Sequence, residues 1–278
     1  MTHPDQERQA RALHDSIPAT DGAGVSLRRV LGTPALMQID PFLLLDEFYS
    51  TDPKDYIAGF PAHPHRGFET LTYMIDGRMR HEDNKGGSGL LKAGGAQYMT
   101  AGRGIIHSEM PEQEDGLLRG LQLWINLPAS HKMTAPSYQD IPAHAMSVFD
   151  QGPAQITLVS GTLSGHTGPA RGAAQTPLFA DLLWRASGPV SLTLPVTHNA
   201  FLYGLAGQID IAGQPLTAGR LAHLSTGRRL NLRGERGSRV VLVAGQPISE
   251  PVARYGPFVM TTRQEIIDAS RDFQAGRF

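Results

Sequence analysis

Short segments in which apolar and polar residues alternate recur along most of the chain. Residues 121–127 alternate between apolar and polar side chains, and residues 68–75 are rich in β-branched and aromatic ones. The second of these segments ends at Asp76-Gly77, a strong turn signal. Both features are typical of strands, so we expect an all-β protein.

The C-terminal end has a different pattern. Thr262 is followed three positions later by Glu265, which is the spacing of a capping box at the start of a helix. Ile266, Ala269 and Phe273 then recur at helical spacing along one face. A helix this short is not stable alone in water. We therefore expect a short C-terminal helix that docks on the β structure.

The chain contains a weak internal repeat. Residues 91–102 align with residues 216–227, and upstream of them residues 73–77 resemble residues 203–207, with the same spacing from tyrosine to glycine in both segments. Few residues are identical, but the turn glycines keep their spacing, as a duplicated pair of β-barrels would require.

This repeat leads to a division of the chain into four parts. We expect an N-terminal arm over residues 1–24 and a first barrel over residues 25–140. A second barrel is expected over residues 141–246, and a tail with the helix over residues 247–278.

Composition excludes several classes of function. The chain of 278 residues has no cysteine, so thiolate metal ligands and disulfides are excluded. Its net charge is −1 and its lysines and arginines form no run, which argues against direct binding of nucleic acid. It has no apolar segment of membrane-spanning length, and its polar N-terminus lacks the apolar core of a signal peptide. We therefore expect a cytoplasmic protein without membrane contact.

Two histidine-containing pairs predict a metal site. His63 and His65 flank Pro64, and His107 and Glu109 follow a glycine-rich turn at residues 102–104. In a strand, residues i and i+2 lie on the same face, about 6–7 Å apart, so each pair can reach one ion. Imidazole and carboxylate ligands suit iron, nickel, manganese, copper or zinc better than calcium or magnesium.

The remaining histidines give no such signal. His81 lies in a polar segment and is expected to be solvated. Surface positions are expected for His131, His144 and His166. Either packing or exposure is expected for His198 and His223. In the repeat, none of the four candidate ligands has a counterpart, since the positions opposite them are Thr193, Pro195, Leu232 and Gly234. We therefore expect one metal per chain, in the first barrel.

The segments around these pairs resemble the pirin family of the cupin superfamily. The resemblance is carried by residues 59–70 and 99–111, with further matches over 42–48, 250–252 and 255–260, and it extends from about residue 25 to the end. It implies two tandem cupin (jelly-roll) barrels, of which the first binds metal and the second is degenerate. The implied cofactor is one Fe(II) per chain, although other divalent transition metals fit the same donors.

The family pattern also implies the ligands. They are His63, His65, His107 and Glu109. General cupins often take the carboxylate from the first motif, which here would be Glu69. Glu69 shares strand parity with His63 and His65, so we expect it to orient one of the histidines while Glu109 is the ligand. A bulge at Pro64 would break that parity.

The resemblance implies two alternative functions. Some family members have quercetin 2,3-dioxygenase activity, which would give this chain dioxygen and a small aromatic molecule as substrates, with Glu109 as both ligand and base. Other members are metal-dependent regulators that bind a protein partner without turnover. A metal-dependent isomerase is disfavoured, because no set of lysines and arginines flanks the predicted ligands.

Overall fold

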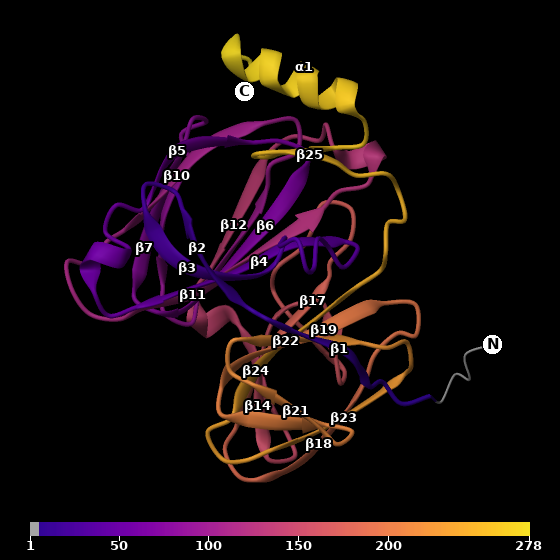
Figure 1. Cartoon of the computed structure of the whole chain (residues 1–278). Helices are drawn as coiled ribbons and strands as arrows, with labels where there is room; N and C mark the ends of the chain where they lie inside the picture. Colours follow the sequence, from indigo (N-terminus) through magenta and orange to yellow (C-terminus); the bar gives the residue numbers. More distant parts are fainter. Residues whose placement is uncertain (1–5) are drawn as a thin grey trace.

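Strands dominate the structure, a computed structural model that describes residues 6–278 (Figure 1). The first barrel has a seven-stranded sheet and a four-stranded sheet. The larger sheet has the order β12 (Ser137–Ile141), β9 (Ala96–Thr100), β6 (Phe68–Asp76), β11 (Leu118–Asn126), β4 (Phe42–Ser50), β3 (Val25–Leu31) and β2 (Ile17–Asp21). The smaller sheet has the order β5 (Phe60–His65), β10 (Ile105–Pro111), β7 (Arg78–Asp83) and β8 (Ser88–Lys92).

The second barrel repeats this plan. Its seven-stranded sheet has the order β1 (Ala10–Asp15), β22 (Arg220–Leu224), β19 (Asn199–Ala206), β24 (Arg239–Gly245), β17 (Leu178–Trp184), β14 (Ala154–Ser160) and β13 (Ser147–Gln151). Its four-stranded sheet has the order β18 (Gly188–Thr193), β23 (Arg229–Gly234), β20 (Gln208–Ile211) and β21 (Gln214–Thr217). The short elements are β15 (Thr162–Leu163), β16 (His166–Thr167), η1 (Pro53–Asp55), η2 (Ala129–His131) and η3 (Ala143–Ala145).

The predicted all-β class with two barrels and a short C-terminal helix is confirmed. The segment predicted as an arm differs from the expectation, because residues 10–21 form two strands. β1 pairs antiparallel with β22 of the second barrel, whereas β2 pairs with β3 of the first. This segment therefore ties the two barrels together. The first five residues of the predicted arm lie outside the described residues.

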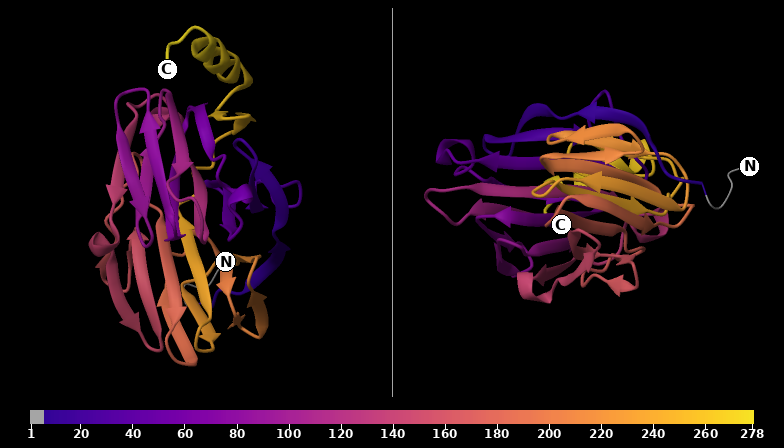
Figure 2. Two further views of the ribbon diagram at one scale, coloured as in Figure 1. Left: turned by 90° about the vertical axis from the view of Figure 1, so that its left-hand side faces the viewer. Right: turned by 90° about the horizontal axis from the view of Figure 1, so that it is seen from below.

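The two large sheets pack against each other, so that the barrels lie one above the other (Figures 1 and 2). The shared core between them is made of apolar and aromatic side chains from both barrels, including Phe42, Leu71, Leu123, Phe179, Phe201 and Val243. Phe42 and Phe201, one from each barrel, meet edge to face with ring centroids 5.5 Å apart. Burial of this apolar surface holds the barrels as one unit.

Two related polar contacts cross this core. The Tyr73 hydroxyl of the first barrel donates to Asp181 Oδ2 of the second over 2.9 Å, and Arg239 pairs with the same carboxylate. In the opposite sense, the Tyr203 hydroxyl donates to Glu47 Oε2 over 2.7 Å, and Arg119 pairs with Glu47. The same combination of tyrosine, carboxylate and arginine thus occurs twice. One set is Tyr73, Asp181 and Arg239, and the other is Tyr203, Glu47 and Arg119. Tyr73 and Tyr203 are also the tyrosines that the sequence repeat aligned.

The C-terminal tail docks on the first barrel, at the end away from the second (Figure 1). It contains β25 (Ala253–Tyr255), β26 (Phe258–Met260) and α1 (Arg263–Gln274), and the predicted capping box of Thr262 and Glu265 is present. An apolar cluster joins the helix to the tail; its buried members are Phe258, Met260, Ile266, Ala269 and Phe278. No helix within residues 6–278 is long and apolar enough to cross a membrane.

The tail lies directly against the segment that links β5 to β6. Gly67 has φ +86°, and a Cβ atom there would lie 2.0 Å from the Val259 carbonyl oxygen, so the close approach requires glycine. The buried Lys132 ammonium donates to the carbonyl oxygens of Gly67 and Val259 over 2.9 and 3.0 Å. The sequence around the predicted metal ligands therefore serves two purposes, since it also anchors the tail.

Candidate metal centre

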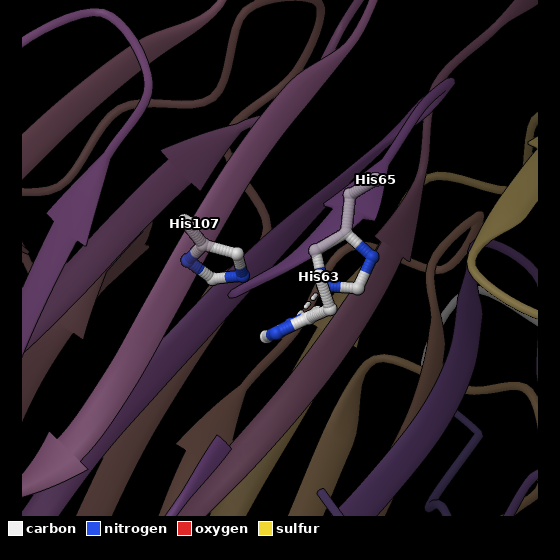
Figure 3. A group of neighbouring side chains, drawn as sticks. All are labelled: His63, His65 and His107. Carbon is white, nitrogen blue, oxygen red and sulfur yellow. Dashed lines mark hydrogen bonds between the residues drawn. The ribbon is translucent and has the colours of Figure 1, made fainter. Parts of the chain in front are cut away.

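Two neighbouring strands bring three of the predicted ligands together. β5 pairs antiparallel with β10, and His107 lies directly opposite His63. His65 lies two residues beyond His63 and faces the same way (Figure 3). One ligand atom from each of the three imidazoles lies within 4.8 Å of the others. Within residues 6–278 this is the one group of three or more histidine or carboxylate side chains gathered so closely.

The chemistry of these imidazoles fits a metal ion. His65 and His107 are 4% and 1% exposed. Neither ring nitrogen of His107 has a hydrogen-bond partner among the described residues. A buried polar atom without a partner costs on the order of 1–3 kcal/mol, which coordination of a cation would remove. The three imidazoles are therefore a credible set of ligands for a transition metal.

Burial also sets the protonation state of the cluster. Desolvation, and secondarily the neighbouring His107 and His63, hold the pKa of His65 well below its usual value. Desolvation, with smaller contributions from His63 and His81, does the same to the pKa of His107. Both side chains are thus neutral at pH 7, the form in which imidazole binds metal.

Glu109 lies beside this cluster without belonging to it. On β10, His107 and Glu109 face the same side, since both follow a regular register against β7. The Glu109 carboxylate is buried and accepts hydrogen bonds from Gln122 Nε2 over 3.0 Å and from Thr72 Oγ1 over 3.4 Å. Its oxygens are not among the ligand atoms within 4.8 Å of one another.

The predicted role of Glu69 is wrong. Its carboxylate accepts from the Tyr98 hydroxyl, the Thr100 hydroxyl and the Ala173 amide, each over 2.8 Å. Glu69 therefore faces the packed sheets between the barrels and orients none of the three histidines. The parity argument fails because the chain turns at Gly67, so that β5 and β6 belong to different sheets. The register of β5 at Pro64 itself is regular, and the irregularity lies between the His63 and Phe60 pairings.

The expectation that His81 is solvated is also wrong. It is 4% exposed, its Nε2 lies 2.9 Å from Asp140 Oδ2, and its ring stacks on that of Tyr138. β7 alternates outward arginines with the inward Met79 and His81. The alternation is present in the sequence, but the charged residues beside His81 favoured the interpretation of a polar, solvated segment. His144 and His166 are exposed as predicted, whereas His131 is half-buried.

A pocket opens beside the histidine cluster. Its volume is about 560 Å³, a size that suits a small organic molecule. Its apolar lining includes Leu44, Phe60 and Trp124, and its polar lining includes His63, His65 and Gln122. The Trp124 ring lies 5.3 Å from the His65 ring. A planar substrate in this pocket would therefore contact both an aromatic wall and the candidate metal ligands.

Two arginines, Arg29 and Arg254, also line the pocket. The expectation that no set of lysines and arginines flanks the predicted ligands did not include these two arginines. These residues lie far from the histidine motifs in the sequence and reach the pocket through β3 and β25. No local pattern could have indicated them.

The depressed histidine pKa values predict how the stability of the metal-free protein depends on pH. An unfolded histidine titrates near pH 6.5, and His65 and His107 titrate lower when folded. The unfolded chain thus binds more protons below about pH 6.5, so the free energy of unfolding should fall there, by up to about 1.4 kcal/mol per pH unit for each histidine.

Urea unfolding of chelator-treated protein between about pH 7 and pH 5 measures this effect. The variant His65→Ala should show a shallower fall than the wild-type protein. An identical pH dependence in both proteins would contradict the assignment of a buried neutral imidazole at this position.

Comparison with known proteins identifies the family. The pirin family model matches residues 24–125, and the model of the pirin C-terminal cupin domain matches residues 179–278. A Pseudomonas aeruginosa protein named "Putative quercetin 2,3-dioxygenase" is 47% identical, over 97% of each chain. A Caulobacter vibrioides protein named "Pirin-like protein" is 46% identical, over 94% of this chain and 95% of the relative.

Solved structures agree with these sequence matches. A crystal structure of a quercetin 2,3-dioxygenase from Acinetobacter baumannii superposes with a TM-score of 0.91 and 30% identity, over 98% of this chain and 99% of the other. Both family models, the relatives and the two-barrel architecture thus lead to the same conclusion. The chain belongs to the pirin family.

Proposed function

We propose that this chain is a non-heme iron-dependent dioxygenase that cleaves a flavonol-like aromatic ring, as a quercetin 2,3-dioxygenase does. The observation that carries the proposal is the cluster of three histidines beside a pocket with an aromatic wall. The similarity to proteins named for quercetin 2,3-dioxygenase activity supports the same assignment.

The proposed ligands are His63, His65, His107 and Glu109, holding one Fe(II) per chain. Glu109 follows His107 on the same strand face, and Gln122 is positioned to fix its carboxylate. Four protein ligands leave positions open on an octahedral ion, as in other non-heme iron oxygenases. When bound, the iron would supply a site for dioxygen and lower the pKa of a coordinated substrate hydroxyl.

Glu109 and two side chains that line the pocket have distinct proposed roles. The Glu109 carboxylate accepts the proton of the flavonol 3-hydroxyl, which makes the heterocycle electron-rich. Trp124 and Leu44 border the planar ring and exclude water from it. In the overall reaction, the flavonol takes up both atoms of dioxygen, and one ring carbon leaves as carbon monoxide.

The variant Glu109→Ala tests the role of this carboxylate. In protein loaded with Fe(II) under anaerobic conditions, we expect quercetin-dependent oxygen uptake to fall at least about a hundredfold, because both a ligand and the general base are lost. The variant Glu114→Ala, at an exposed position of the same region, should retain full activity. Full activity of Glu109→Ala would contradict the role proposed for Glu109.

The alternative is a metal-dependent regulator that binds a protein partner. One observation favours it: Arg66, next to His65, pairs with Asp272 of helix α1, and its carbonyl accepts from the Val259 amide. A change at the metal could thus reach the surface of the helix. Binding of a partner that is lost when the iron is oxidised, without quercetin turnover, would favour this alternative.

A further inference from the structure

The charged side chains of the pocket show an imbalance. Asp21, Arg29 and Arg254 line it, so that two arginines face one aspartate. Arg29 is fully engaged, since it forms ion pairs with Asp21 over 2.9 Å and with Asp46 over 2.6 Å. Those two pairs also satisfy the two acidic residues. Arg254 is the cation that remains.

Arg254 has no carboxylate partner within 4.0 Å among residues 6–278. Its Nη1 donates to the Leu43 carbonyl over 3.2 Å, and its guanidinium lies 4.8 Å above the centre of the Trp124 ring. A guanidinium has five N–H donors, so most of them stay available. Burial and the positive charge of Arg29 lower the pKa of Arg254, and the charges of Asp46 and Asp21 oppose this in part. The pKa of Arg29 is raised, chiefly by the hydrogen bond between Arg29 and Asp46.

The position of Arg254 relates it to the candidate metal site. The Trp124 ring has His65 as one neighbour, 5.3 Å away between ring centres, and the Arg254 guanidinium as another. A flat molecule that bound the metal through an oxygen atom and extended past the Trp124 side chain could therefore present its far end to Arg254. The guanidinium fork matches a carboxylate in geometry and charge.

Arg254 belongs to the C-terminal tail and not to the barrel that holds the histidines. It lies on β25, which crosses the end of the first barrel near β5 (Figure 1). Gly256 and Pro257 of the same tail line the pocket too. The tail is held in place by Lys132 and Gly67, so the position of Arg254 is fixed by the fold.

We infer that the natural substrate of this pocket is an aromatic molecule with a carboxylate at the end opposite its metal-binding hydroxyl, and that Arg254 binds this carboxylate. The inference rests on the proposed function, because it takes this pocket as the substrate site. Quercetin carries hydroxyl groups but no carboxylate. It would therefore be a substitute that fits the aromatic wall and leaves Arg254 without a partner.

Calorimetric titration of the Fe(II)-loaded protein under anaerobic conditions tests the inference without turnover. The two probes are 6-hydroxy-2-naphthoate and its methyl ester, which differ in charge at the end remote from the hydroxyl. We expect the wild-type protein to bind the acid at least about tenfold more tightly than the ester, as for a charge-assisted contact. The preference should weaken as salt is added.

Three variants separate charge from packing. In Arg254→Gln the preference for the acid should disappear while the affinity for the ester is unchanged, and Arg254→Lys should retain part of the preference. Arg236→Gln, at an exposed turn of the second barrel, should bind both probes as the wild type does. Equal affinities of the wild type for acid and ester would overturn the inference. So would an equal loss of both affinities in Arg254→Gln, because that would show a packing role.

The same proteins distinguish failure of the inference from failure of the proposed function. An Arg254-dependent preference in a protein without quercetin-dependent oxygen uptake would support the inference and contradict the flavonol dioxygenase. Oxygen uptake in a wild-type protein that shows no preference for the acid would contradict only the inference.

Discussion

Replacement of His107 by alanine is expected to abolish stoichiometric metal binding. His107 is a proposed ligand on β10, and both of its ring nitrogens are buried without a partner among the described residues. Mutation of a group that merely supports a metal ligand typically costs 10- to 100-fold in metal affinity. Loss of the ligand itself should therefore weaken binding by more than about a hundredfold. Metal content per chain after gel filtration measures the effect.

A thermal measurement complements the metal analysis. A metal present at about a hundred times its dissociation constant stabilises the wild-type fold by about 2.7 kcal/mol, and this increment should vanish in His107→Ala. His144→Ala, at an exposed position, is the matched control and should keep one metal per chain. One tightly bound metal in His107→Ala, with an unchanged rise in melting temperature, would contradict the site.

Replacement of Asp181 by alanine should have the largest effect on stability. The carboxylate accepts from Tyr73 of the first barrel and pairs with Arg239, and its side chain is 4% exposed. Its removal leaves a largely buried guanidinium and a phenol without their partner. Breaking a buried ion pair in this way costs about 3–5 kcal/mol, whereas Tyr73→Phe, which removes one hydroxyl, should cost about 1 kcal/mol.

Urea unfolding measures these costs. The fluorescence of the two tryptophans reports on the unfolding of separate barrels. Trp124 lies in the first barrel and Trp184 in the second. In the wild-type protein we expect their transitions to coincide, because the large sheets share one core. In Asp181→Ala the midpoint should fall, with the two probes separating if the barrels uncouple. A cost below about 1 kcal/mol would show that the Tyr73–Asp181–Arg239 contact does not hold the barrels together.

Local patterns in the sequence predicted much of the fold and of the candidate site. Strand alternation, the capping box of Thr262 and the pair of His63 and His65 each depend on residues close in the chain. Since those features are set by local geometry, they could be recognised without a structure. The repeat added the second barrel, because duplicated turns keep their glycines.

Features that depend on distant parts of the chain could not be predicted. The pairing of β1 with β22 joins segments some two hundred residues apart, and no periodicity specifies it. The role of Glu69 was misjudged because a single turn at Gly67 changes which face a residue presents. Arg254 enters the pocket only because the tail packs on β5 and β6, a contact that exists only in the folded protein.

The measurement that tests the central claim most directly is the amount of dioxygen consumed and carbon monoxide released by the Fe(II)-loaded wild-type protein with quercetin. We expect one molecule of each per quercetin, no reaction in the metal-free protein, and recovery when Fe(II) is returned. Oxygen uptake without carbon monoxide would contradict this type of ring cleavage. No uptake, with one iron bound per chain, would contradict a flavonol dioxygenase and favour the regulator.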